Sequence, residues 1–330
     1  MKIFLTGATG YVGGEALYNL YHSGDSHDIA VLNRHAESDK SILEAFPKVR
    51  VVQGDLDDTE LIENESKAAD IVFHLASTKH LPSSQAISKG LSSRDKPSFW
   101  VQMSGASMFS VPDIEHKSYG EPPSEIINDV DDTEKIRKII TDNPARTVDH
   151  LVLSQDRVKT ALIIGPLIYG TGRGPGNTRS IQAPEMARVT LQQGEGFRVG
   201  AGKSAWSNVH VQDLGLLAAD LAKAAAEDRS GCWNHDGVYA VENGGLEFGE
   251  LGELIAREAH AQGLIKSSKV THVMSADEAN KAMPAGAIFW ATNAVTVATR
   301  ARKQLNWEPL QPSLTETVEE VVEIEAKRLK

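Results

Sequence analysis

Short apolar runs alternate with longer stretches of helical periodicity through the first half of the chain. The runs predict buried β-strands at Lys2–Thr6, Asp28–Leu32, Val49–Gln53, Asp70–Leu75, Ser98–Met103 and Lys159–Ile164. Strands and helices in alternation are typical of a parallel sheet with helices on both faces. Ligands of such sheets bind at the carboxyl ends of the strands, so the residues that follow each strand are the first candidates for chemistry.

The first strand is followed at once by a glycine turn and a helix. Gly7, Gly10 and Gly13 lie in TGATGYVGG, and apolar residues at mostly helical spacing run from Tyr11 to Tyr21. Glycines allow the backbone to turn tightly and approach a pyrophosphate, while free amides and the helix dipole favour its negative charge. A glycine triplet alone is weak evidence, but its place between a strand and a helix indicates a dinucleotide-binding site.

The second half of the chain predicts a smaller unit built around the same sheet. Helices are expected near Asp213–Ala226 and Leu246–Gln262, and strands at Val238–Glu242 and Lys269–Val273. A final helix is expected from Ser313, because Ser313 and Glu316 have the spacing of a capping box. The glycine-rich segment 169–202 is interpreted as a stretch of chain that leaves the sheet.

We therefore predict a doubly wound, parallel α/β sheet of the Rossmann type with a smaller, interleaved C-terminal substrate lobe. Residues 1–168 are expected to form the dinucleotide-binding domain. Residues 169–330 are expected to form mostly the substrate lobe, with segments at about 203–243 returning to the sheet.

Composition narrows the class of partners. The chain has 330 residues and a net charge of −11, which argues against a nucleic-acid-binding face. Its single cysteine, Cys232, leaves no internal disulfide and fits a reducing compartment. No leader precedes the first strand, and no apolar run has the ~20 residues of a membrane span. We expect a cytoplasmic protein without nucleic-acid or membrane partners and, since no His/Cys/Asp cluster has ligand spacing, without a metal.

Short motifs along the chain resemble those of the extended and atypical short-chain dehydrogenase/reductases, which are NAD-dependent epimerase/dehydratase-like proteins. In order they are TGATGYVGG, GDL at 54–56, HLAS at 74–77, GPLIYG at 165–170, HVQD at 210–213 and LNWEP at 305–309. Each motif is weak alone, whereas all of them in the family's order are strong evidence. The resemblance implies a small-molecule substrate, and it leaves a homodimer open because members of the extended class often pair through helices.

The resemblance also implies a set of cofactor-binding positions. They are Gly7, Thr9, Gly10, Tyr11, Val12, Gly13, Asn33, Arg34, Asp55, Leu56, Leu75, Ala76, Ser77, Pro166, Leu167 and Ile168. Where NAD-binding proteins carry an acid for the ribose 2′-hydroxyl, the second strand here ends in Asn33, Arg34 and His35. The planar guanidinium of Arg34 can grip a phosphate, so we expect NADP(H) rather than NAD(H). The alternative is that Arg34 is a solvated loop residue.

The proton-transfer site departs from the family pattern, because no tyrosine is followed by a lysine four residues later. The helix that should carry this pair is expected at 145–155, where Arg146 and His150 share one face. A histidine has a pKa suited to proton transfer, so His150 is a candidate acid. The alternative is an ordinary surface helix.

The family's catalytic serine position aligns with Gly105, which Ser104 and Ser107 flank. Tyr119, in the loop that follows, is the remaining phenolic candidate. The candidate catalytic residues are therefore Ser104, Tyr119 and His150. Serines after a strand are also common turn residues, which is the alternative for Ser104.

Two functions compete. The first is an NADP(H)-dependent oxidoreductase, or an epimerase/dehydratase-like enzyme, that acts on a small carbonyl or alcohol with a non-standard proton-transfer site. The retained C-terminal half favours it, including a glycine-rich segment with Arg173 and Arg179, which could bind a substrate carboxylate or phosphate. The alternative is that these two arginines are flexible and exposed. The second is a non-catalytic dinucleotide sensor similar to the NmrA-like proteins, which signal to a protein partner. The missing tyrosine and lysine favour the sensor.

Overall fold

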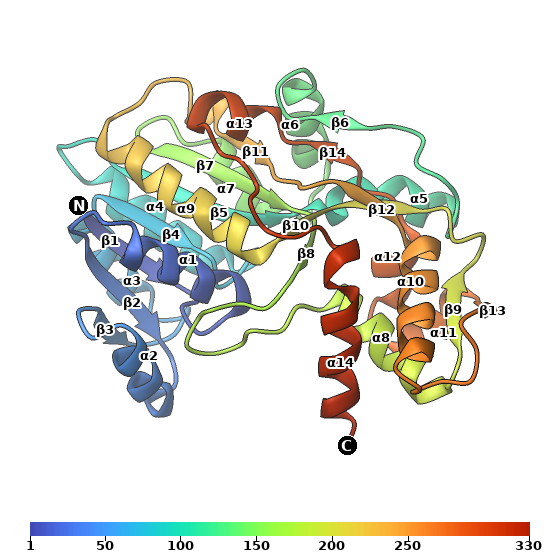
Figure 1. Ribbon diagram of the computed structural model, residues 1–330. Coiled ribbons are helices and arrows are strands. Elements are labelled where there is room, and N and C mark those ends of the chain that lie inside the picture. Colours follow the sequence, from blue (N-terminus) through green and yellow to red (C-terminus); the bar gives the residue numbers. More distant parts are fainter.

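A seven-stranded parallel sheet forms the body of the molecule in the computed structural model, which describes residues 1–330 (Figure 1). In spatial order its strands are β11 (Val238–Ala240), β7 (Lys159–Gly165), β5 (Phe99–Gly105), β4 (Ile71–His74), β1 (Lys2–Thr6), β2 (Asp28–Asn33) and β3 (Arg50–Gln53). The strands predicted in the first half are all present, with ends shifted by at most two residues. The strand order reverses between β1 and β4, which is the switch point where doubly wound sheets bind ligands.

Helices cover both faces of this sheet. α1 (Tyr11–His22) and α9 (Val211–Ala226) pack together on one face, and the other carries α3 (Thr59–Ala68), α4 (Leu81–Ser92) and α7 (Thr147–Leu153). Neighbouring residues of β1 enter different cores, with Phe4 in one and Leu5 in the other, both fully buried. A strand buried on both sides is what a doubly wound sheet requires. The predicted Rossmann-type α/β fold is confirmed.

Three further helices complete this body of the molecule. They are α2 (Asp39–Ala45), α5 (Val111–His116) and α6 (Thr133–Asp142). α6 packs beside α7, while Ile42 of α2 reaches the same core as α1.

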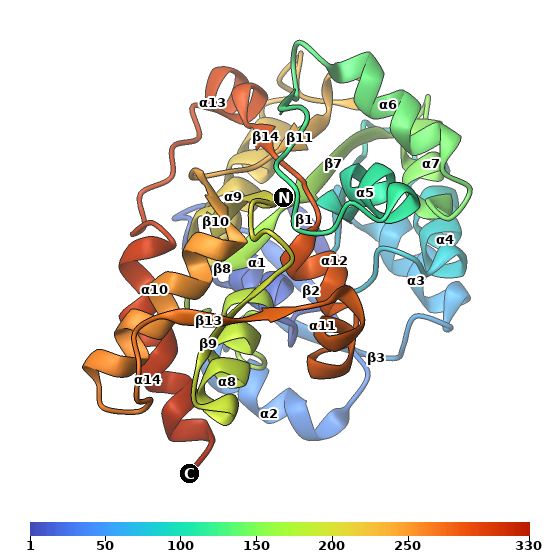
Figure 2. The same cartoon turned by 90° about the vertical axis from the view of Figure 1, so that its right-hand side faces the viewer.

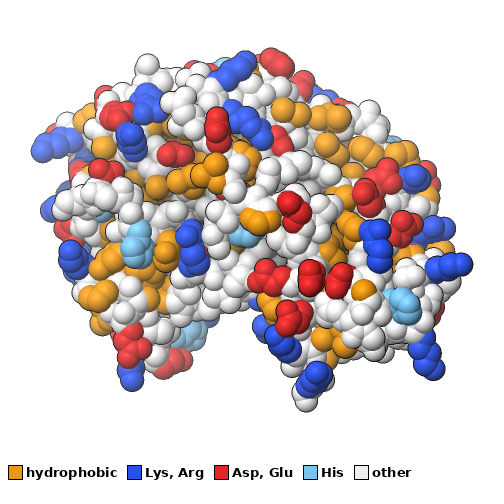
Figure 3. Space-filling view, in the orientation of Figure 1, with side chains coloured by type: hydrophobic (Ala, Val, Ile, Leu, Met, Phe, Trp, Pro, Cys, Tyr) orange, Lys and Arg blue, Asp and Glu red, His pale blue; other side chains and the backbone are white.

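The smaller lobe consists of short sheets and helices (Figure 2). Its strand pairings are β8 (Leu167–Tyr169) and β12 (Gly245–Glu247) on either side of β10 (Ala205–His210), β9 (Gly196–Val199) with β13 (Val270–Met274), and β6 (Ile127–Asn128) with β14 (Thr296–Val297). Its helices are α8 (Gln182–Gln193), α10 (Phe248–Ala261), α11 (Ala276–Ala282), α12 (Gly286–Ala291) and α14 (Val318–Arg328). α13 (Thr299–Leu305) instead packs on β11 and α9 of the main body. Within 203–243, β11 joins the main sheet and α9 covers it, whereas β10 belongs to a small sheet. The surface is hollowed between the body and the lobe (Figure 3).

Two helix predictions need correction. The final helix begins at Val318 after a 3₁₀ turn, not at Ser313. The Glu316 carboxylate accepts from the Ser313 amide at 2.8 Å, but the Glu316 amide bonds the Ser313 carbonyl, so only half of the capping box forms. The helix expected at 145–155 is shorter and spans Thr147–Leu153.

The HVQD and LNWEP motifs meet at the start of α9. The Asp213 carboxylate accepts from the Leu310 amide at 2.8 Å, and the Trp307 indole donates to the Asp213 carbonyl at 2.9 Å. His210 Nδ1 accepts from the Gln212 amide at 3.2 Å and so caps the helix. These contacts give both motifs a structural role, in which they tie the C-terminal segment to the sheet. None of the helices is long and apolar enough to cross a lipid bilayer.

Candidate functional site

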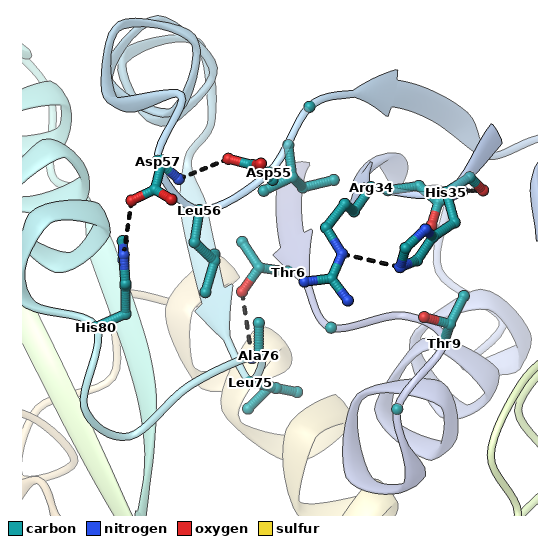
Figure 4. Close-up of a pocket in the computed structure, with 15 residues that line it drawn as sticks. Thr6, Thr9, Arg34, His35, Asp55, Leu56, Asp57, Leu75, Ala76 and His80 are labelled. Carbon is teal, nitrogen blue, oxygen red and sulfur yellow. Dashed lines mark hydrogen bonds and ion pairs between the residues drawn. The ribbon is translucent and has the colours of Figure 1, made fainter.

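A groove of about 420 Å³ runs along the carboxyl ends of β1 to β4 (Figure 4). Nine of the expected cofactor positions line it: Gly7, Thr9, Gly10, Asn33, Arg34, Asp55, Leu56, Leu75 and Ala76. Thr6, Leu32, His35, Gly54, Asp57 and His80 complete the lining. Its volume and its place at the switch point of the sheet are typical of a small-molecule or cofactor site.

The glycine turn brings three elements together at the centre of this groove. Gly7 has a φ of +88°, and a Cβ there would lie 2.8 Å from the backbone nitrogen of Ala76. The Gly10 amide closes the turn onto the Gly7 carbonyl at 2.9 Å. A Cβ at Gly13 would collide with that carbonyl, so α1 can sit close to the strand end only with glycine there. The turn therefore has the backbone shape that a pyrophosphate needs.

The start of α1 presents free donors. The amides of Tyr11 and Val12 have no hydrogen-bond partner, and no side chain caps the helix at Gly10. Orphaned amides at a helix start, with the positive end of its dipole, bind phosphate groups. The residues present therefore fit the diphosphate of a dinucleotide.

The side chains of Tyr11 and Val12 do not line the groove. The Tyr11 hydroxyl donates to the Gly170 carbonyl at 2.6 Å, and burial raises the pKa of this phenol well above its ordinary value. Val12 packs against the core beneath α1. These two positions therefore offer a ligand their unpaired amides and not their side chains.

The end of β2 carries a cation without a matching acid. Arg34 is exposed, its Nε donates to His35 Nε2 at 2.9 Å, and it forms no ion pair with a carboxylate. Glu37, the nearest acid along the chain, faces His35 at 3.6 Å and does not line the groove. Asp39 accepts from Asn33 and from Gln53, the latter at 2.7 Å. The guanidinium of Arg34 therefore keeps its terminal donors for a ligand.

A buried histidine supports the floor of the groove. His74 lies between Thr6, whose Oγ1 is 2.7 Å from Nδ1, and Ser83, whose Oγ is 3.2 Å from Nε2. Burial lowers the pKa of His74 to about 3, so the ring is neutral. Thr6 also accepts from the Ala76 amide at 3.4 Å, which links this contact to the groove wall.

Four expected cofactor positions lie beyond the groove. Ser77 Oγ accepts from the Lys79 and His80 amides, both at 3.1 Å, and so caps the turn after β4. Pro166, Leu167 and Ile168 lie at the end of β7 and in β8, which pairs with β10. Their part in cofactor binding stays a prediction.

A polar cluster occupies the carboxyl end of β5. Ser104 Oγ donates to Asp149 Oδ2 at 2.7 Å, and both side chains are buried. Arg146 Nη1 lies 3.4 Å from Ser104 Oγ and 3.5 Å from Asp149 Oδ2, while its Nη2 donates to Ser107 at 3.1 Å. Burial raises the pKa of Asp149, against the opposing effects of Ser104 and Arg146. Asp149 was not among the predicted site residues, although its spacing of three residues from Arg146 on a helix was a signal.

The structure does not bring Ser104, Tyr119 and His150 together. His150 Nε2 bonds the Ile140 carbonyl at 2.6 Å, so the ring is turned toward α6. This placement counts against His150 as a proton donor to a substrate beside Ser104. The Tyr119 hydroxyl has no hydrogen-bond partner, and its backbone lies against Gly200 in the smaller lobe.

Arg173 and Arg179 are not free to bind a substrate anion, contrary to the expectation. Arg173 pairs with the fully buried Glu15, whose carboxylate also accepts from the Arg173 amide at 2.8 Å. Arg179 is bidentate to the buried Glu325, at 2.8 and 2.9 Å, and also pairs with Glu185. The carboxylates satisfy the charge of both arginines, which hold the 170–179 segment in place. No group of His, Cys, Asp and Glu is arranged to hold a metal ion.

Comparison with known proteins agrees with this geometry. The model of the NAD dependent epimerase/dehydratase family matches residues 3–91. A protein named "Oxidase ucsJ" from an Acremonium species is 36% identical over 99% of this chain and 98% of its own length. The dTDP-glucose 4,6-dehydratase DesIV of Streptomyces venezuelae, solved with NAD, has a TM-score of 0.66 at 16% identity and covers 99% of this chain and 97% of its own.

A second solved structure, the UDP-glucose 4-epimerase of Thermotoga maritima with UDP-glucose, has a TM-score of 0.60 at 14% identity and full coverage of both chains. Such distant likenesses support the fold, whereas the Acremonium relative is close enough to establish the family. The chain belongs to the NAD-dependent epimerase/dehydratase family of extended short-chain dehydrogenase/reductases.

Proposed function

We propose that this protein is an NADP(H)-dependent oxidoreductase that acts on a small carbonyl or alcohol. The observation that carries the proposal is the groove at the switch point, in which an unpaired arginine follows β2. The glycine turn and the free amides of Tyr11 and Val12 would hold the diphosphate, and Asp55 and Leu56 would contact the adenine. When bound, the cofactor supplies the hydride chemistry, and the protein supplies orientation and charge.

The preference for NADP(H) rests on Arg34. A 2′-phosphate placed at the end of β2 would meet its guanidinium in the planar geometry that suits bidentate binding. Two nearby acids, Glu37 and Asp39, do not line the groove. Glu37 pairs with His35, and Asp39 is engaged by Asn33 and Gln53. This arrangement favours the phosphorylated ribose over a free 2′-hydroxyl.

A small substrate fits the charge of the smaller lobe better than a nucleotide sugar does. Some distant structural neighbours were solved with UDP-glucose, which carries a diphosphate. In this chain Glu15 pairs with Arg173, and Glu185 and Glu325 pair with Arg179. These arginines are therefore not available to bind the diphosphate of a nucleotide sugar. The name of the Acremonium relative, an oxidase, also favours redox chemistry.

The dinucleotide sensor remains the second candidate, because the tyrosine and lysine of the family are missing. Turnover separates the two functions. Wild-type protein is incubated with NADPH or NADH and a panel of aldehydes and ketones, and loss of the reduced nicotinamide absorbance is followed. We expect oxidation of NADPH with at least one carbonyl and a slower rate with NADH. Binding of NADP⁺ and NADPH with different affinities, without turnover of any carbonyl or alcohol, would instead establish the sensor.

A further inference from the structure

We propose that Arg146, together with Ser107, binds the oxygen of an uncharged carbonyl or alcohol substrate. Asp149 and Ser104 act as positioning residues behind it. The inference rests on the proposed function and deepens it, because it assigns the substrate class and the residues that replace the missing tyrosine and lysine.

The cluster lies beside the cofactor groove. Arg146 precedes the first turn of α7, and Ser104 and Ser107 lie at and just after the end of β5. Gln102 of the same strand donates to the Ser77 carbonyl at 3.0 Å, which joins β5 to the loop whose Leu75 and Ala76 line the groove. A substrate next to the cofactor would therefore reach the cluster from this edge of the sheet.

The guanidinium of Arg146 is held on one side only. Its Nη1 faces Asp149 and Ser104, and its Nη2 donates to Ser107. Its Nε has no protein partner and is not enclosed, and 15% of the side chain is exposed. Arg146 therefore keeps a donor for a ligand while its position is fixed by groups behind it.

Asp149 sets the charge of the site. The carboxylate is fully buried, its Oδ2 accepts from Ser104 and Arg146, and its Oδ1 has no partner. A buried carboxylate persists only when a cation balances it, so Asp149 and Arg146 form a neutral pair. Such a pair can donate to a carbonyl or hydroxyl oxygen, whereas a substrate carboxylate or phosphate would compete with Asp149 for the same cation.

A fixed, charged donor is suited to carbonyl chemistry. It polarises the C=O bond and stabilises negative charge on the oxygen without reorganisation of the site. Ser107 adds a hydroxyl on the same side, since it accepts from Arg146 and its own proton is free to donate. The cluster thus supplies an oxygen-binding function that does not need a phenol.

Benzoate binding tests the charge argument directly, with calorimetry as the readout. Asp149→Asn keeps the shape and an acceptor for Ser104 but leaves the guanidinium unbalanced. We expect benzoate to bind this variant at least about tenfold more tightly than wild type, the worth of a charge-assisted hydrogen bond. The double variant Arg146→Gln/Asp149→Asn should lose the gain. Asp220→Asn, which removes a half-buried carboxylate of α9 outside the cluster, is the charge-matched control and should show no gain.

No gain in Asp149→Asn, or an equal gain in the double variant, overturns the proposal. A second measurement applies if Asp149→Asn does not fold. Arg146→Gln should lower kcat/KM for a neutral carbonyl by about 10²–10³ with unchanged NADPH affinity, and Arg146→Lys should restore part of it. A full rate in Arg146→Gln also overturns the proposal. If wild type turns over no carbonyl, the proposed function fails, while the benzoate titration still decides whether Arg146 is a binding group.

Discussion

Two arginines lie in different electrostatic surroundings at the carboxyl edge of the sheet: Arg34, after β2, and Arg146, beside the end of β5. Arg34 is exposed and lacks a carboxylate partner, which suits a phosphate. Arg146 is mostly buried and is balanced by Asp149, which suits an uncharged oxygen. The roles proposed for these two arginines therefore differ, and the difference comes from the neighbouring carboxylate.

The buried imidazole of His74, under the groove, leads us to predict that the stability of the fold depends on pH. The folded-state pKa of His74 is about 3 and that of an unfolded histidine is about 6.5, so below pH 6.5 the unfolded chain binds more protons at this position. The free energy of unfolding should therefore fall as pH drops from 6.5 toward 3, by up to about 1.4 kcal/mol per pH unit from this group. His74→Gln should show a shallower fall in denaturant unfolding measured across this range. Parallel curves for the two proteins would contradict a neutral buried His74.

Local requirements explain which site residues could be predicted from the sequence. Gly7 is detectable because a positive φ and a close backbone approach demand glycine at that position. Arg34 is detectable because its place after β2 follows from the strand pattern. Asp149 was missed because its burial depends on Ser104, which lies 45 residues away in the sequence. Glu15 likewise meets Arg173 across 158 residues, a pairing that periodicity cannot reveal.

At the scale of elements, α1 is held between the sheet and the 170–179 segment. Arg173 of this segment stacks on Tyr18 at 4.0 Å and pairs with Glu15. The Asn177 amide donates to the Thr9 carbonyl at 2.9 Å, inside the glycine turn. The segment that follows β8 thus braces the part of α1 that would bind the diphosphate.

Removing the buried charge of Glu15 tests this bracing. Glu15→Gln leaves Arg173 without its counterion, and since Arg173 is partly exposed we expect a loss of about 3 kcal/mol in the free energy of unfolding. The matched control is Glu323→Gln, which breaks the exposed pair with Lys327 and should cost under about 1 kcal/mol. Denaturant unfolding measures both. Equal losses in the two variants would show that the buried pair does not anchor the segment.

Element boundaries were predictable where the pattern is local and less so where packing decides. The strands of the main sheet follow their apolar runs closely, because all of them except the edge strand β3 are buried along almost their whole length. α14 begins at Val318, later than predicted, because a 3₁₀ turn precedes it. In this turn the Glu316 amide donates to the Ser313 carbonyl. No side chain caps the helix that begins at Thr147, so the sequence carries no capping signal that would mark its first residue.

At the scale of the whole molecule, the groove lies in the body that the main sheet forms, and the smaller lobe is joined to that body. The chain crosses between them several times, and Asp213 with Trp307 ties the C-terminal segment to α9. The sequence predicts interleaved lobes because no Pro- or Ser-rich linker divides its two halves. It could not predict the charge pairing within the lobe, because that pairing depends on side chains such as Glu325 whose contacts form only in the folded chain.

Cofactor affinity is the most direct test of the account. NADPH and NADH are titrated separately into wild type and Arg34→Gln by calorimetry. We predict that wild type binds NADPH about ten- to a hundredfold more tightly than NADH, and that Arg34→Gln removes most of this difference with NADH affinity unchanged. Equal affinity of wild type for the two cofactors, or an equal loss of both in the variant, would contradict the assignment of the groove to NADP(H).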